Sequence, residues 1–329
     1  MSYSRANLVT SPTPMDRLDR LSAHLGIDLH IKRDDLAGTT LGGNKSRQLE
    51  YYLGAAKAAQ ADTILITGAV QSNFVRTAAA CAAKLGMRAI VQLEQRVPGR
   101  DHLYATSGNV LLSRLIGVEI IEYPDGEDEA GADAALRARA EAERAKGRRP
   151  YVIPLALGNP PLGALGYVRA AAEIVAQQAS PFDFVVIASG SGLTHAGLLT
   201  GLGQADQKTR VIGSCVRRPA PQQRARIRTV LDNLADMMDP HPQVPTDRID
   251  IWDGALTPGY GQIGPPAADA MRLMANHEGL MLDPVYTAKS FAAVPALIND
   301  GTIPAGSRVL FVHTGGLASL FAYPISDMI

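Results

Sequence analysis

The chain has 329 residues, of which 46% are hydrophobic and 19% are charged. Its 32 Lys and Arg residues balance its 32 Asp and Glu residues, so the formal net charge at pH 7 is zero. We therefore expect neither a nucleic-acid-binding protein nor a polybasic membrane-surface protein, because both need clustered positive charge. A chain of this length can bury a large core and suggests about two domains.

Only two cysteines occur, Cys81 and Cys215, and they do not form a C-x-x-C arrangement. This argues against a disulfide framework and a thiolate zinc site, and it fits the reducing cytoplasm. Charged side chains are scattered through the N-terminal segment, and no run of about 18 apolar residues occurs, so we expect neither export nor a membrane span. No H-E-x-x-H pattern occurs either, so no metal site is expected.

Short β-branched segments alternate with Ala- and Leu-rich amphipathic segments along the whole chain. The predicted strands, in chain order, are residues 28–32, 63–67, 88–93, 118–123, 151–154, 184–188, 210–215 and 308–313. The predicted helices are residues 46–59, 74–85, 130–145, 165–178, 268–276 and 287–297. This alternation predicts an α/β fold with mostly parallel strands covered by helices on both faces. Apolar runs such as FVVIA at 184–188 are typical of strands buried on both faces.

Four polar or glycine-rich loops follow these strands or open the helices, where open α/β sheets bind their ligands. The first reads LGGNKSR at 41–47 and places Lys45 at the start of a helix. The helix dipole and Arg47 both disfavour a charged lysine, so the pKa of Lys45 should be lowered. A lysine with a lowered pKa is suited to be a Schiff-base nucleophile. The alternative is an exposed lysine beside a loop.

The second loop reads SGSGLTHAG at 189–197 and connects a strand to a helix. Consecutive backbone N–H groups at such a turn can hold a phosphate, although a plain strand-to-helix turn is the alternative. The third glycine of a dinucleotide fingerprint would fall at His195, which disfavours a nicotinamide dehydrogenase.

The third loop, GAVQSN at 68–73, ends in Ser72 and Asn73, which either cap the next helix or bind a ligand carboxylate or ring oxygen. The fourth loop, HTGG at 313–316, places a hydroxyl where it either bonds a buried ring nitrogen or caps a helix.

In their order and spacing these loops resemble those of fold type II pyridoxal-phosphate enzymes, and most closely the D-cysteine desulfhydrase and 1-aminocyclopropane-1-carboxylate deaminase family. The further motifs that carry the resemblance are PTPMDRL (12–18), IKRDD (31–35), LGALGY (162–167), PGYG (258–261) and LDPVYT (282–287). The resemblance implies two open, twisted, mostly parallel sheets, pyridoxal 5'-phosphate as cofactor, an amino-acid substrate and a homodimer. It also implies a large domain at 1–47 and 159–329 with a small domain at 48–158 inserted into it.

The resemblance assigns roles to residues that match the family's motifs. It makes Lys45 the lysine that bonds to the cofactor, and it implies that Asn73 binds the ring hydroxyl and Thr314 the ring nitrogen. Ser72 seats the substrate carboxylate, together with the neighbouring Asn73. The backbone amides expected to hold the phosphate are those of Ser191, Gly192, Leu193 and Thr194. The tyrosines expected to assist proton transfer are Tyr260 and Tyr286.

One position bears on the reaction. The deaminases carry a carboxylate directly after the tyrosine of DPVY, whereas this chain has Thr287. Neutral groups at Thr287 and Thr314 favour α,β-elimination over ring opening. We therefore expect a carbon–sulfur lyase that converts a cysteine-like amino acid to pyruvate, ammonia and sulfide. The alternatives are an L-cysteate sulfo-lyase, a 1-aminocyclopropane-1-carboxylate deaminase and a non-catalytic protein that binds a phosphate ligand.

Two positions depart from the family pattern. Leu193 stands where glycine is common, and Phe74 stands where desulfhydrases have His and deaminases have Gln. We expect Phe74 to border the substrate pocket and to loosen substrate selection, because an apolar wall discriminates weakly. The alternative is that Phe74 packs inward against its helix.

Overall fold

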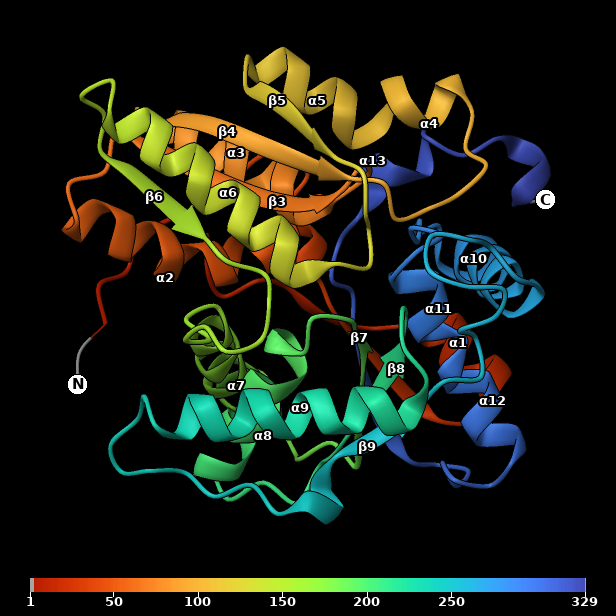
Figure 1. Ribbon diagram of the computed structural model, residues 1–329. Coiled ribbons are helices and arrows are strands. Elements are labelled where there is room, and N and C mark those ends of the chain that lie inside the picture. The colour runs from red at the N-terminus through yellow and green to blue at the C-terminus, as the bar shows by residue number, and fades with distance from the viewer. Residues whose placement is uncertain (1–2, 329) are drawn as a thin grey trace.

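The computed structural model describes residues 3–328, and its helices surround two sheets (Figure 1). The strands of the larger sheet are β1 (Met15–Arg17), β2 (Asp28–Lys32), β7 (Phe184–Ser189), β8 (Arg210–Cys215), β9 (Asp250–Trp252) and β10 (Arg308–Val312). Their order is β1-β2-β10-β7-β8-β9, and only the β1–β2 pair is antiparallel. The smaller sheet is parallel throughout, in the order β5-β4-β3-β6. Its strands are β3 (Thr63–Ala69), β4 (Arg88–Glu94), β5 (Glu119–Tyr123) and β6 (Pro150–Ile153).

The helices divide between the two sheets in the same way (Figure 1). Near the smaller sheet lie α2 (Asn44–Ala58), α3 (Asn73–Lys84), α4 (His102–Thr106), α5 (Gly108–Ile116) and α6 (Glu129–Arg144). With the larger sheet lie α1 (Asp19–Leu25), α7 (Ala164–Gln177), α8 (Leu193–Gln204), α9 (Ala220–Ala235), α10 (Pro265–Glu278), α11 (Thr287–Phe291) and α12 (Ala293–Asn299). A short helix, α13 (Leu317–Leu320), and the 3-10 turns η1 (Asp34–Leu36), η2 (Thr246–Arg248) and η3 (Ile325–Asp327) complete the fold.

Alternate residues of each central strand pack against opposite helical layers, as a period of two requires. In β3, Ile64 and Ile66 belong to the core formed with α2 and α3, whereas Leu65 packs with α6. In β7, Val186 packs with the layer of α10–α12 and Val185 with the layer of α7–α9. Burial on both faces explains why these strands are continuous apolar runs.

The α/β fold with mostly parallel sheets is confirmed, and every predicted strand is present within two residues of its expected bounds. The sequence analysis missed β1 and β9, which are three-residue strands at the edges of the larger sheet. The domain boundaries at 47/48 and 158/159 stay a prediction.

The single helix expected at 287–297 is wrong, because α11 ends at Phe291 and α12 begins at Ala293. Pro295 explains the interruption. It has no N–H to donate to the carbonyl of Phe291, and its ring clashes with that carbonyl in a continuous helix.

A buried ion cluster joins β2, α2 and α7. Arg47 of α2 donates to Asp34 through Nε and Nη2, at 2.9 and 2.8 Å, and to Glu173 of α7 through Nη1 at 3.0 Å. Lys32 binds the same Glu173, and the Tyr167 hydroxyl donates to Asp34. Two cations thus face two carboxylates, so the buried charges balance. Although burial alone would raise the pKa of Glu173, Arg47 and Lys32 hold that pKa at about 2.

Replacing Glu173 with Gln should lower the free energy of unfolding at pH 7 by about 3 kcal/mol, because it leaves Arg47 and Lys32 buried with too little negative charge. The Glu173 pKa is about 2 in the folded chain against an ordinary 4.5. Its stabilising contribution is therefore present above pH 4.5 and is lost as the pH falls toward 2.

Urea unfolding of the wild type and Glu173→Gln checks this expectation, and the gap between them should shrink over that pH range. The control is Glu141→Gln, at an exposed pair on α6, which should change stability little. Equal losses in the two variants would contradict the assignment.

Candidate active site

The loop before α2 turns through two glycines in backbone conformations that other residues rarely adopt. Gly42 and Gly43 have φ of +57° and +110°. A Cβ on Gly42 would lie 1.9 Å from the carbonyl oxygen of Asp35. The turn brings α2 against the C-terminal HTGG loop, where the Asn44 amide donates to the Thr314 carbonyl at 3.0 Å. The first and fourth loops of the sequence therefore meet.

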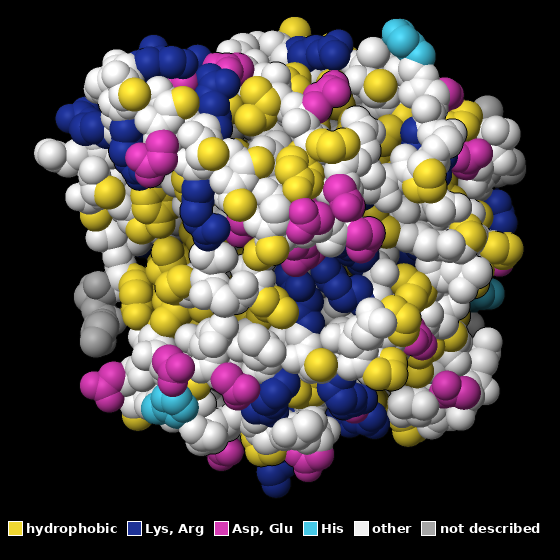
Figure 2. All heavy atoms as spheres, in the orientation of Figure 1, with side chains coloured by type: hydrophobic (Ala, Val, Ile, Leu, Met, Phe, Trp, Pro, Cys, Tyr) yellow, Lys and Arg dark blue, Asp and Glu magenta, His cyan; other side chains and the backbone are white. Residues whose placement is uncertain are grey.

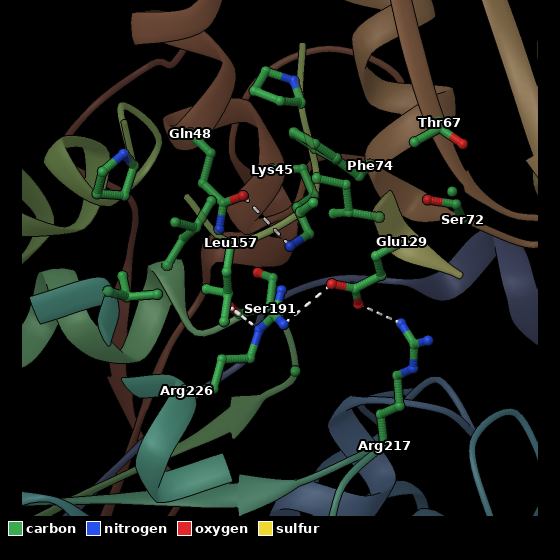
Figure 3. Close-up of a pocket in the computed structure, with 18 of the residues that line it drawn as sticks. Lys45, Gln48, Thr67, Ser72, Phe74, Glu129, Leu157, Ser191, Arg217 and Arg226 are labelled. Carbon is green, nitrogen blue, oxygen red and sulfur yellow. Dashed lines mark hydrogen bonds and ion pairs between the residues drawn. The ribbon is translucent and has the colours of Figure 1, made fainter. Parts of the chain in front are cut away.

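Lys45 extends from the first turn of α2 into a cleft (Figure 3). Its Nζ donates to Gln48 Oε1 at 3.4 Å and lies 5.4 Å from the centre of the Phe74 ring. Burial of the ammonium group lowers the pKa of Lys45 to about 8. The direction expected from the sequence is confirmed, but the role given to Arg47 is wrong, because Arg47 is bound to Asp34 and Glu173.

The SGSG loop lies beside the start of α2. Gly192 precedes α8 in the left-handed conformation, and Asn44 and Gln48 both donate to the Thr194 hydroxyl, at 2.9 and 2.8 Å. The backbone amides of residues 191–194 donate to no acceptor in the part of the chain that the structure describes. Free amides at the N-terminus of a helix are suited to bind an anion.

The third loop caps its helix, as one interpretation expected, and it also lines the cleft. The Ser72 hydroxyl caps α3 by accepting from the Val75 amide at 3.2 Å, and it also lines the cleft. Asn73 accepts a hydrogen bond from Asn109 at 2.9 Å and lines the cleft as well.

Phe74 packs inward, as one interpretation expected, and it also borders the cleft, as the other expected. Its ring is 7% exposed and packs edge-on against Tyr52 within the core around α3. The same ring lines the cleft beneath the Lys45 ammonium. Phe74 is therefore both a core residue and part of the cleft wall.

Tyr260 and Tyr286 meet across the cleft, with 2.7 Å between their hydroxyl oxygens. Burial raises the pKa of Tyr286 well above its usual range, so its hydroxyl stays protonated at neutral pH. Lys289 binds the loop that carries Tyr260, because its Nζ donates to the Gly259 carbonyl at 2.6 Å. Sequence reasoning missed this buried lysine.

A smaller cavity adjoins the cleft and brings six predicted site residues together with Lys45. These six are Asn73, Ser191, Gly192, Thr194, Tyr286 and Thr314. Leu193 lines the larger cleft. The structure thus gathers every predicted site residue around two adjoining cavities.

Thr287 is bound to Asp283 and does not reach the two cavities. Its side chain is fully buried, its hydroxyl donates to Asp283 at 2.7 Å, and it lines neither cavity. Asp283 is also fully buried. It lies close to Gly316, because a Cβ built on that glycine would lie only 2.6 Å from the Cγ of Asp283. Burial raises the pKa of Asp283. A carboxylate therefore lies beneath the HTGG loop, where the sequence analysis considered only neutral groups.

Sequence reasoning also missed a group of arginines on the cleft wall. They are Arg96, Arg217, Arg218 and Arg226, and they surround Glu129. Arg217 and Arg218 follow β8, at the strand edge where α/β sheets bind ligands, and that position could have identified them.

Two further findings concern residues 3–328. No group of three or more His, Cys, Asp or Glu side chains is arranged to hold a metal ion. None of the helices described there has the length and apolarity needed to cross a membrane.

Comparison with known proteins gives a consistent result. The family model described as pyridoxal-phosphate dependent enzyme matches residues 7–315. A D-cysteine desulfhydrase of Yersinia pestis is 41% identical over 323 residues, which covers 98% of this chain and 96% of that protein. A 1-aminocyclopropane-1-carboxylate deaminase of Methylobacterium nodulans is 38% identical over 327 residues, covering 98% of this chain and 97% of that one.

Solved structures agree at the level of the fold. A crystal structure described as an ACC deaminase homologue superposes with a TM-score of 0.87 at 36% identity, covering 98% of this chain and 94% of the other. O-ureido-L-serine synthase, at 20% identity and a TM-score of 0.68 over 94% and 90% of the two chains, shares the fold. The match along residues 7–315 and the near-complete coverage of these relatives establish that the chain belongs to the pyridoxal-phosphate dependent enzyme family.

Proposed function

We propose that this protein is a pyridoxal-phosphate dependent carbon–sulfur lyase of the D-cysteine desulfhydrase kind. It converts a cysteine-like amino acid and water to pyruvate, ammonium and hydrogen sulfide by α,β-elimination. The observation that carries the proposal is Lys45, which extends into the cleft with a pKa of about 8 between the SGSG and HTGG loops. The 41% identity to a D-cysteine desulfhydrase over 98% of the chain supports it.

The residues around the smaller cavity fit pyridoxal phosphate. The amides of Ser191 to Thr194, which lack acceptors in the described chain, are suited to hold its phosphate. Lys45 is the amine for its aldehyde, and Asn73 and Thr314 are hydrogen-bonding partners for the ring. When bound, the cofactor supplies an electron sink for negative charge at the substrate Cα.

The remaining residues act on the substrate. Ser72 and Asn73, at the N-terminus of α3, bind its carboxylate, which the helix dipole also favours. With the cofactor bound, the amine of Lys45 would be placed to take the proton from Cα. The Tyr260–Tyr286 pair faces the cleft as a hydrogen-bonded unit and donates a proton to the departing sulfur.

We further propose that the enzyme is a cytoplasmic homodimer with a large domain at 1–47 and 159–329 and a small domain at 48–158. The two sheets support this division, because all four strands of the smaller sheet fall between residues 63 and 153.

Reduction with borohydride should attach the cofactor to the peptide that contains Lys45, because the buried amine is the one that faces the cavity. Purified protein should be yellow, and Lys45→Ala should lose both the colour and pyruvate release from cysteine. Lys289 is the internal control, since burial lowers its pKa to about 8 as well, but its ammonium is bound to backbone carbonyls. Attachment at Lys289 would refute the assignment, and a colourless wild type would favour a non-catalytic phosphate-binding protein.

The 38% identity to a deaminase favours 1-aminocyclopropane-1-carboxylate deaminase as the second candidate function. The two reactions give different products, pyruvate from cysteine and 2-oxobutanoate from the cyclopropane. We expect kcat/KM for D-cysteine to exceed that for the cyclopropane by about tenfold or more, a ratio that one hydrogen-bonding difference can supply. Comparable values for the two substrates would overturn the desulfhydrase assignment.

Phe74→His should change the relative kcat/KM values for D-cysteine, L-cysteine and β-chloroalanine by about tenfold, because it places a hydrogen-bonding group on an apolar wall of the cleft. It should also lower the melting temperature, since the ring is part of the core. Phe321→His, at an exposed aromatic, is the matched control. Lower stability with unchanged substrate ratios would restrict Phe74 to a packing role.

A further inference from the structure

Arg76, on α3, carries a buried guanidinium group whose hydrogen-bonding partners are uncharged. The basic side chains that gather in the hollow of Figure 2 reach the solvent, whereas Arg76 is only 1% exposed. Burial lowers its pKa to about 10, and no carboxylate among the described residues forms an ion pair with it. An apolar side chain fills such a space at a lower cost in free energy, so the charge points to a role beyond packing.

The two partners of Arg76 belong to segments that hold the site together. Its Nη1 donates to the Thr40 carbonyl, and its Nε donates to Asn109 Oδ1 at 3.0 Å. Thr40 and Leu41 lie in the loop that leads to Lys45, and their φ angles of +48° and +61° are unfavourable for residues other than glycine. Arg76 therefore fixes a strained segment close to Lys45 as well as the side chain of Asn109.

Asn109 carries this contact onward to Asn73. It lies in the first turn of α5 and is 1% exposed. Its Nδ2 donates to Asn73 Oδ1 at 2.9 Å and to the Gln71 carbonyl at 3.0 Å, and its backbone amide donates to Gln71 Oε1 at 2.9 Å. The Asn109 amide group is therefore held at both its oxygen and its nitrogen.

The hydrogen bonds of this chain can run in one direction only. A guanidinium group has donors but no acceptor, so Asn109 must turn Oδ1 toward Arg76 and Nδ2 toward Asn73. Asn73 then accepts with its Oδ1, and its own Nδ2 finds no acceptor among the described residues. Because Asn73 lines both cavities, this N–H donor is available to a ligand there. The positive charge at the far end polarises the amides and strengthens that donor.

We propose that Arg76 and Asn109 are positioning residues that set the Asn73 amide, so that it offers only a donor to the ring oxygen of the cofactor. A donor at this place stabilises the ring oxygen in its deprotonated form, which is the stronger acceptor. Neither Arg76 nor Asn109 lines either cavity, so both act through Asn73. The inference rests on the proposed function, because it needs pyridoxal phosphate beside Lys45.

Asn109→Asp keeps the shape of the side chain and reverses its bond to Asn73. The new carboxylate pairs with Arg76 and has no N–H to donate, so Asn73 turns its Nδ2 toward it and its Oδ1 toward the cavity. An oxygen at that place favours a ring oxygen that keeps its proton.

Absorption of the holoenzyme reports this change without any turnover. Pyridoxal phosphate bonded to a lysine absorbs visible light when its ring oxygen is deprotonated and near-ultraviolet light when that oxygen is protonated. We expect Asn109→Asp to lower the ratio of visible to near-ultraviolet absorbance by about tenfold or more, since one hydrogen bond to a charged group contributes that much. An unchanged ratio would overturn the proposal.

Variants of Arg76 test the same chain from its other end, without a new carboxylate. Arg76→Met should lower the absorbance ratio and should weaken binding of pyridoxal phosphate to the apoenzyme by about tenfold, as measured by equilibrium dialysis. Arg76→Lys keeps the charge and a donor, so it should retain most of the wild-type ratio and affinity. If Arg76→Met lowers only the melting temperature, Arg76 has a packing role and the proposal fails.

Thr209→Val is the matched control, because it removes a buried hydrogen bond elsewhere. The Thr209 hydroxyl donates to the Phe182 carbonyl at 2.7 Å, and Thr209 lines neither cavity. This variant should lower the melting temperature and leave the absorbance ratio unchanged. A fall in the ratio as large as that of Asn109→Asp would mean that the absorption reports stability alone, which would contradict the proposal.

Pyruvate release from cysteine separates this inference from the proposed function. A wild type that is yellow and releases pyruvate, with the same absorbance ratio as Asn109→Asp, would overturn the positioning role and leave the reaction standing. A wild type that is yellow and releases no pyruvate, with the ratio lowered in Asn109→Asp, would support the positioning role and overturn only the reaction.

Discussion

The pairing of Arg47 with Asp34 and Glu173 is the interaction on which the site depends most. These three residues lie on α2, on the turn after β2 and on α7, so one buried guanidinium joins three segments that are distant in sequence. Lys45 is two residues before Arg47, and the orientation of the first turn of α2 determines where its amine points. An electrostatic contact in the interior of the molecule thereby sets the geometry of the cleft.

The site itself belongs to neither sheet alone. The larger sheet contributes the SGSG and HTGG loops and the two tyrosines, whereas the smaller sheet contributes Ser72, Asn73 and Phe74. Each loop follows the carboxyl end of a parallel strand, where helix N-termini collect and positive electrostatic potential is available. Anionic groups on a cofactor and on a substrate are suited to such a place, and this explains why a net-neutral chain can have a strongly basic cleft.

Much of the fold could be predicted because the controlling signals are local. Runs such as FVVIA identify buried strands, and glycines before Lys45 identify a loop that turns sharply. The three-residue strands β1 and β9 carry too little pattern to be recognised. The bond from the Thr287 hydroxyl to Asp283 could not be predicted, because sequence alone does not reveal which buried group a hydroxyl contacts. The arginine group escaped notice because Arg96 and Arg226 are brought together only by the packing of the two halves.

The pairing of β2 with β10 has a consequence for how the chain folds. Asp28 lies beside Arg308, 280 residues later, so the larger sheet joins the two ends of the sequence. The strands of the smaller sheet, in contrast, all fall within one continuous segment. During synthesis the smaller sheet is able to form first, while β2 waits with an unpaired edge until the last strand leaves the ribosome. A chain that stops before Arg308 would leave β2 and β7 without the strand that separates them, exposing apolar edges that favour aggregation.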